Sequence, residues 1–377
     1  MIYLDHAATT PPHDDVVAAM EPYLESHYHN PSAGYADSAA EGLETARERV
    51  AALIGATPES IVFTGGGSEA DNLALKGVVD TTPGDSDGHV VTSAMEHDAI
   101  EETCRWLERC GVEVTRVSPR EDGRVDPAAV EDAIRPDTEI VSIMHANNET
   151  GVVQPLEEIV AVAHERGALV HSDTVQSVGK LSVDVEALGL DMASLSAHKF
   201  YGPKGVGALY VRDGLEAELE PLIHGGGQEG GLRSGTENVP GLVGMGVAAE
   251  RARTDLDERA DRLSGLRDDF VRRVRETTDG TLVGHPERRL PGYALFCFEE
   301  TTGAQIVDAL ADRGIAVSSG SACHTGTVSP SRVLTEMGID AQTALGAVRF
   351  SMGRRTTADD VDQAVAALEE ALEVVRA

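Results

Sequence analysis

The chain has 377 residues, which is enough for a large domain with a smaller companion and a sizeable core. Its formal charge of −33, from 64 acidic and 31 basic residues, opposes binding to nucleic acid or to an anionic membrane surface. A hydrophobic content of 41% excludes a disordered acidic protein.

Lysine is scarce, with four lysines among the basic residues. Dispersed acidic residues combined with few lysines are typical of proteins adapted to high internal salt, where ions screen the self-repulsion of the chain. We therefore predict that dilute buffer lowers the stability or the activity of the protein.

Cysteine usage points to a reducing compartment. Cys104, Cys110, Cys297 and Cys323 form no CxxC pair and no disulfide framework. Residues 1–12 show no signal-peptide pattern, and no apolar run approaches the ~18 residues that a membrane helix needs. We expect a soluble, cytoplasmic protein with no membrane partner.

In chain order, residues 1–12 are extended, and a first helix follows Ser38, where Glu41 completes a capping box. Apolar strand candidates then alternate with amphipathic helices, which is typical of a mostly parallel sheet with helices on both faces. The strand candidates are 60–63, 89–93, 139–145, 168–171 and 192–195, and the helix candidates are 100–110, 128–134 and 156–166.

The C-terminal third has a different pattern. Residues 240–277 are helical over a long stretch, and they are followed by strands and helices that end in an amphipathic helix after residue 358. We expect an α/β fold: a large domain over residues 13–254 with a mostly parallel sheet between helices, and a smaller α+β domain over 255–377. The segment 1–12 is expected to pack on the small domain.

Polar residues follow each strand candidate of the large domain. Because ligands bind outside the carboxyl ends of strands in open α/β sheets, these clusters are expected to converge on one crevice. They are residues 64–69, Glu96 and His97, Asn147 and Asn148, Asp173 and Gln176, and Ser196, His198 and Lys199.

Lys199 ends a buried strand just before the Gly202-Pro203 break. A partly desolvated lysine has a lowered pKa and can condense with an aldehyde, although an ordinary snorkelling lysine is the alternative. Asp173 also ends an apolar strand, where a carboxylate is costly unless it is paired. Alone, Asp173 could be a metal ligand or a helix cap. Together, Asp173 and Lys199 favour pyridoxal 5'-phosphate (PLP), whose protonated ring nitrogen takes an acidic partner.

A metal site is not favoured, because the histidines near these strands lack HExxH spacing. The glycine-rich turn of residues 64–72 joins a strand to a helix, which Ser68 could cap while the backbone approaches an anion. Ser196 and His198 could add phosphate contacts. An ordinary glycine-rich turn is the alternative.

Cys323 lies among small residues, ahead of Pro330 and of a helix that Ser329 is expected to cap. This setting favours a mobile loop with a nucleophilic thiol over a buried small residue, whereas Cys297 lies in an apolar strand and is expected to be inert. Arg349, inside a strand of the small domain, suits a substrate carboxylate or an ion pair at the domain junction.

Together these residues resemble the cysteine desulfurases of the PLP fold-type I, class V aminotransferase superfamily. The similarity extends in order over nearly the whole chain. The motifs are Tyr3-Leu-Asp-His-Ala-Ala-Thr-Thr-Pro, Met144-His-Ala-Asn-Asn-Glu-Thr-Gly, His198-Lys-Phe-Tyr-Gly-Pro-Lys-Gly, Arg233-Ser-Gly-Thr, Ser318-Ser-Gly-Ser-Ala-Cys and Arg349-Phe-Ser.

The resemblance implies a role for each site residue. Lys199 would carry PLP, His97 would stack on its ring and transfer protons, and Asp173 would pair with the ring nitrogen. Gln176 and Asn148 would contact the ring oxygen. Phosphate would be held by Gly67, Ser68, Ser196 and His198, with Thr236 from the second subunit of a homodimer.

The implied reaction converts L-cysteine to L-alanine and leaves a persulfide on Cys323, with Arg349 and Asn148 binding the substrate. The loop after Cys323 resembles the longer version found in desulfurases that pass sulfur to an acceptor protein such as an iron–sulfur scaffold. The chain departs from many relatives at His324, which either lowers the Cys323 pKa or is merely exposed.

Three alternatives stay open at this point. A selenocysteine lyase or a class V aminotransferase would use the same cofactor. A non-catalytic iron–sulfur assembly protein would use Cys323 and nearby histidines to hold a cluster, but such a protein has no need of Lys199.

Overall fold

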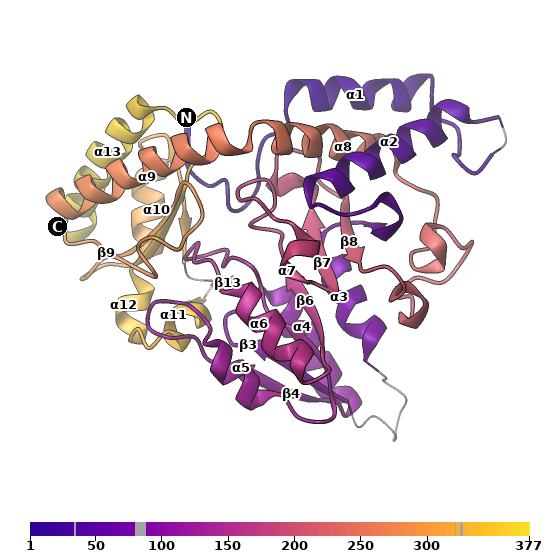
Figure 1. Ribbon diagram of the computed structural model, residues 1–377. Coiled ribbons are helices and arrows are strands. Elements are labelled where there is room, and N and C mark those ends of the chain that lie inside the picture. The colour runs from indigo at the N-terminus through magenta and orange to yellow at the C-terminus, as the bar shows by residue number, and fades with distance from the viewer. Residues whose placement is uncertain (34, 80–87, 321, 325–326) are drawn as a thin grey trace.

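The computed structural model describes the whole chain except residues 34, 80–87, 321 and 325–326 and the side chains of 217, 322–324 and 327–328. Figure 1 shows two lobes: most of the first two thirds of the chain forms the large one, and the C-terminal third forms the small one, beside which the N-terminus lies. The long helices α8 (Val239–Thr254) and α9 (Leu256–Thr277) follow one another and lead from the large lobe to the small one.

The large lobe is built on a sheet that has seven strands within the described residues. Four neighbouring pairs are parallel, and β8 alone runs antiparallel to both of its neighbours. The spatial order is β2 (Ile61–Thr64), β8 (Gly207–Val211), β7 (Met192–Ser196), β6 (Leu169–Asp173), β5 (Thr138–Ser142), β3 (His89–Ser93) and β4 (Glu113–Val117).

Helices cover both faces of this sheet. Successive residues of a strand point to opposite faces, so Val90 and Ile140 join one core while Val91 and Val141 join the other. This is why the strands read as continuous apolar runs. One core includes α3 (Gly67–Val78) and α4 (Asp98–Cys110), and the other includes α2 (Asp37–Leu53), α5 (Pro127–Ala133), α6 (Leu156–Glu165), α7 (Val185–Leu188) and α8, with α1 (Asp14–Glu25) packed on α8.

The small lobe has a second sheet and its own core. Its strands, in spatial order, are β12 (Ser318–Ser319), β15 (Ala347–Ser351), β10 (Tyr293–Cys297) and β9 (Thr281–Leu282). Its helices are α9, α10 (Gly303–Ala311), α11 (Arg332–Glu336), α12 (Ala341–Leu345) and α13 (Ala358–Arg376). β1 (Ile2–Tyr3) pairs with β11 (Ile315–Ala316), and Leu4 is part of this core.

The α/β class and the five strands predicted from the sequence are present. Short 3-10 helices, at 58–60, 197–199, 216–218 and 229–231, were not predicted. Three predicted caps were wrong. Ala36 is the N-cap of α2, so Ser38 already lies inside that helix, and Gly66 rather than Ser68 precedes α3. Ser331, not Ser329, caps α11.

The sequence predicted a mobile loop around Cys323, and the described backbone of this segment contains two short strands. Backbone pairing joins β13 (Ala322–His324) to β14 (Thr327–Ser329) in an antiparallel pair, with Cys323 opposite Val328. The pair lies between the two lobes (Figure 1). The side chain of Cys323 lies outside the described residues.

Candidate active site

The carboxyl ends of the central strands surround a cavity of about 550 Å³. It brings together nine of the residues singled out from the sequence: Gly67, Ser68, His97, Asn148, Asp173, Gln176, Ser196, His198 and Lys199. The lining also includes Gly65, Gly66, Glu69, Asp71, Met144, Val175, Lys204 and Gly205. The predicted convergence therefore occurs, and it follows from the parallel arrangement of β5, β6 and β7.

Lys199 ends the short 3-10 helix that follows β7. Its Nζ donates to the carbonyl oxygens of Ala7 (2.6 Å) and Ala8 (2.9 Å), so the N-terminal segment forms one wall around the amine. Burial lowers the pKa of Lys199 to about 8, with the Arg349 guanidinium as the second cause. A lysine with this pKa is neutral in a useful fraction of molecules near neutral pH, as a nucleophilic amine requires.

Asp173 is buried at the end of β6. Its Oδ1 accepts the Val175 amide at 2.9 Å, and among the described residues no other donor bonds to this carboxylate. Burial raises the pKa of Asp173, while the charges of His97 and Lys199 lower it. A cationic donor bound in the cavity would stabilise a carboxylate in this position.

Asp71 lies beside this group and was missed by the sequence analysis. It is fully enclosed on α3, and its Oδ1 has no hydrogen-bond partner in the described part of the chain. Burial and the neighbouring Asp173 carboxylate raise the pKa of Asp71 well above its ordinary value. Two buried carboxyls thus face the cavity, and two neighbouring like charges favour retention of a proton by one of them.

His97 is the N-cap of α4 and is exposed to the cavity side of the molecule. Its Nδ1 accepts the Ala99 amide at 3.1 Å, which places the proton of the neutral ring on Nε2. His198, by contrast, is held by Thr9, and burial lowers its pKa to about 4. His198 is therefore a neutral hydrogen-bonding group, whereas His97 has a nitrogen available for proton transfer.

The N-terminus of α3 forms the glycine-rich end of the cavity. The amides of its first turn, Gly67, Ser68 and Glu69, have no acceptor within the helix and carry its positive dipole end. The Glu69 carboxylate bonds the Gly65 amide and Arg233, so its charge is compensated. A Cβ at position 67 would lie only 2.7 Å from the Val175 side chain. The absence of a side chain at Gly67 therefore avoids a clash at this part of the cavity.

Gln176 is fixed at both ends of its amide. Its Nε2 donates to the Ala7 carbonyl at 3.1 Å, and its Oε1 accepts the hydroxyl of Tyr293 at 2.8 Å. Tyr293 belongs to β10 of the small lobe and is fully buried. The orientation of Gln176 is therefore set jointly by the N-terminal segment and the small lobe, which sequence reasoning did not find.

Arg349 forms an ion pair at the junction of the two lobes, which is the alternative to substrate binding. It donates to Asp5 Oδ1 at 2.7 Å and to the Asn148 carbonyl at 2.8 Å. Its Nε is buried and has no partner among the described residues. The group thus lies next to the cavity, with one donor uncommitted.

Among the described side chains, two predicted residues are absent from this lining: Arg349, which lies next to it, and Thr236, which is exposed in the segment before α8. The backbone of Cys323 belongs to the β13–β14 hairpin. Two other thiols, Cys104 and Cys297, are buried, and burial raises the pKa of each to about 12, which makes them unreactive.

The cavity residues fit PLP. A lysine with a lowered pKa lines the cavity together with a buried carboxylate that has no ion-pair partner among the described residues, and a helix N-terminus suited to a phosphate lines it too. The described helices include none that is long and apolar enough to cross a membrane.

Comparison with known proteins assigns the chain and its fold to a class. The model of the family "Aminotransferase class-V" matches residues 2–364. A solved structure described as a NifS-like protein superposes with a TM-score of 0.92, at 37% identity over 99% of each chain. A second, SspA in complex with cysteine, has a TM-score of 0.83 at 39% identity, over 95% of this chain and all of that one.

Curated relatives show to which group of class V aminotransferases the chain belongs. The cysteine desulfurase IscS of Anaeromyxobacter dehalogenans is 46% identical over all of this chain and 93% of that protein. The IscS of Methanosarcina thermophila is 41% identical, again over the whole chain and 93% of that protein. The chain belongs to the cysteine desulfurases of the class V aminotransferase family, which are PLP-dependent enzymes.

Proposed function

We propose that this enzyme removes the sulfur atom of L-cysteine, releases L-alanine and holds the sulfur as a persulfide on Cys323. The observation that carries the proposal is the cavity in which Lys199, Asp173 and His97 meet beside the cysteine-bearing hairpin. The family assignment supports it, because its curated members are named for this reaction.

In this proposal the chain holds PLP at both ends. Lys199 bonds to it, Asp173 pairs with its ring nitrogen, and Gln176 and Asn148 contact its ring oxygen. Bound there, the cofactor supplies an electron sink that makes the Cα proton of the substrate acidic. The phosphate contacts come from Gly67, Ser68, Ser196 and His198, with Thr236 from a second subunit.

The remaining steps are assigned to side chains. Lys199 and His97 transfer the substrate protons, because both residues line the cavity and the Nε2 of His97 is not used by the bond to Ala99. Arg349 and Asn148 bind the substrate carboxylate, since the Arg349 guanidinium lies next to the cavity and donates to the carbonyl oxygen of Asn148, which lines it. The Cys323 thiolate bonds to the substrate sulfur as the Cβ–S bond breaks. The electron pair goes to the substrate carbon, which takes a proton and leaves as alanine.

A homodimer is part of the proposal. Thr236 is exposed and lies outside the cavity lining of its own chain, as expected of a residue that serves a second subunit. A larger cavity of about 850 Å³ adjoins the site, since Lys204 lines both cavities. Its lining also includes Met1, Val17 and Leu24. These three apolar residues are exposed, and a second subunit would cover them.

We also propose that the persulfide passes to an acceptor protein, such as an iron–sulfur scaffold, in the cytoplasm. The position of the hairpin between the lobes supports delivery to a partner.

The test is alanine production from L-cysteine by the purified, PLP-loaded enzyme in high salt. The wild-type enzyme is expected to form one alanine for each sulfur released, and Cys323→Ala is expected to form neither product. Cys110→Ser, a thiol change at the opposite end of α4 from His97, is the matched control and should retain the activity. Full activity of Cys323→Ala would refute the assigned nucleophile, and pyruvate in place of alanine would refute the reaction.

A further inference from the structure

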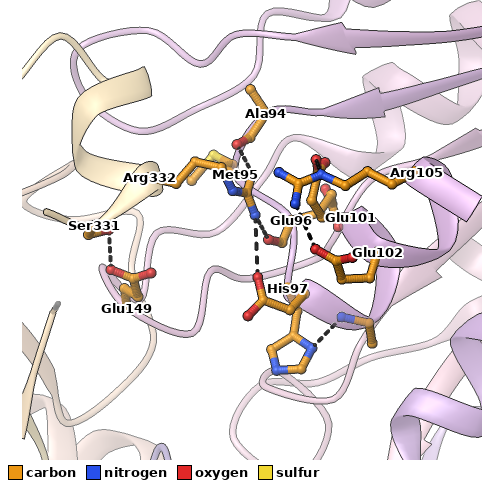
Figure 2. A network of polar contacts seen from close by, with 12 residues as sticks. Ala94, Met95, Glu96, His97, Glu101, Glu102, Arg105, Glu149, Ser331 and Arg332 are labelled. Atoms are coloured by element: carbon orange, nitrogen blue, oxygen red, sulfur yellow. Dashed lines mark hydrogen bonds and ion pairs between the residues drawn. The ribbon is translucent and has the colours of Figure 1, made fainter. Parts of the chain in front are cut away.

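The segment that carries Cys323 starts and ends beside one side chain of the large lobe, Glu149. At its start, a Cβ placed on Gly320 would lie 3.7 Å from Glu149 Oε2. At its end, the hydroxyl of Ser331 donates to the same oxygen at 2.6 Å (Figure 2). Glu149 directly follows Asn148, so the base of the hairpin rests on the turn that lines the cavity.

Arg332, the first residue of α11, makes the second attachment. Its guanidinium donates to the carbonyl oxygens of Ala94 and Glu96, the latter at 2.6 Å, and it lies 3.9 Å from the Asp98 carboxylate. Figure 2 shows the guanidinium directed at the turn that ends in His97. A planar fork suits two backbone carbonyls at once, which a lysine ammonium cannot match.

These attachments cross the boundary between the lobes. Ser331 and Arg332 belong to the small lobe, while the two turns they hold carry Asn148 and His97 of the large lobe. In each contact one partner of the hydrogen bond is a charged side chain, and such bonds are stronger than those between neutral groups. The Ser331–Glu149 and Arg332–Glu96 bonds are also partly buried. These contacts therefore fix the position of the hairpin base relative to the cavity, and not only relative to the small-lobe sheet.

We propose that Arg332 and the Ser331–Glu149 pair are positioning residues, which hold the base of the β13–β14 hairpin at a set place relative to the His97 and Asn148 turns. This rests on the proposed function, in which Cys323 must approach a substrate bound in the cavity. In this proposal Arg332, Ser331 and Glu149 do not touch the substrate. They restrict the positions that the Cys323 thiol can occupy, because they fix the point from which the hairpin extends.

The experiment uses the full-length, PLP-loaded enzyme and compares Arg332→Ala, Arg332→Lys and Glu336→Ala. Glu336 is the matched control, since it also joins α11 to the large lobe, through an exposed contact of 3.2 Å with Ser118, but lies away from the clamp. Hydrogen exchange of the backbone amides in 322–329 is measured first. The rate of alanine formation in a single turnover and the binding of L-cysteine, followed by cofactor absorbance, are measured on the same samples.

For Arg332→Ala we expect amide exchange of the hairpin to rise about tenfold and alanine formation to fall about tenfold or more. Cysteine binding and the cofactor spectrum should stay within about twofold of wild type, because the clamp does not touch the cavity ligand. Arg332→Lys should recover part of both losses, and Glu336→Ala should match wild type.

Unchanged hairpin exchange in Arg332→Ala would overturn the proposal, and so would an equal loss in Glu336→Ala or a parallel loss of cysteine binding. These outcomes are separate from failure of the proposed function. If wild-type enzyme formed no alanine, the exchange measurements would still show whether Arg332 anchors the hairpin.

Discussion

In the cofactor-free protein, Lys199 is expected to react with amine reagents far more readily than an ordinary lysine. Burial is the main reason for its pKa of about 8, and Arg349 is the second. At pH 7 such an amine is neutral in about one molecule in ten, against about one in 3,000 for the ordinary pKa of 10.5. The structure therefore predicts about 300-fold more reactive amine at equal accessibility.

Two substitutions should move this titration in opposite directions. Arg349→Gln removes a like charge and should raise the pKa of Lys199, whereas Asp173→Asn removes an opposite charge and should lower it. The assay is brief acetylation over a pH series, with the modified Lys199 peptide quantified by mass spectrometry. Exposed Lys204 serves as an internal reference for reagent activity in each sample.

The expected wild-type midpoint lies near pH 8, with the neutral, reactive amine present above it and lost as the pH falls. A wild-type midpoint near 10.5 would refute the argument that burial tunes the amine. If both substitutions shifted the Lys199 midpoint in the same direction, the charge assignment would be refuted, because the opposite charges of Arg349 and Asp173 must shift this pKa in opposite directions.

Three further predictions concern packing and solvent. Tyr293→Phe leaves the buried Gln176 oxygen without its donor, so it should cost about 1–3 kcal/mol of stability and alter the cofactor spectrum; a variant identical to wild type in both would contradict this. Gly67→Ala should cost about 1–3 kcal/mol by urea unfolding, and Val175→Ala should suppress part of that cost; strict additivity would exclude the clash. Transfer from molar to dilute salt should lower the melting temperature, and an unchanged value would remove the high-salt interpretation.

The central part of the site was predictable because it depends on local signals. Strands β3 and β7 are continuous apolar runs, and the polar residues that follow them must share one edge of a parallel sheet. The edge strand β4 was missed because its side chains are mostly half-exposed and its apolar signal is weak. The antiparallel β8 was not predicted either, although its five residues are all buried.

Contacts between distant segments were not predictable from the same signals. The donor to Gln176 comes from Tyr293, 117 positions away, and Arg349 meets Asp5 across 344 positions. Helix caps failed for a different reason. A serine before an apolar run satisfies the pattern whether it stands outside the helix, as Ser331 does, or inside it, as Ser38 does.

The N-terminal strand pairs with the small lobe, yet the residues just after it serve as acceptors for Lys199 and Gln176 of the large lobe. A peptide fused at Met1 would therefore pull on the same short stretch that lines the reactive amine. Purification tags are better attached after α13, whose last residues are exposed and make no contact with the cavity.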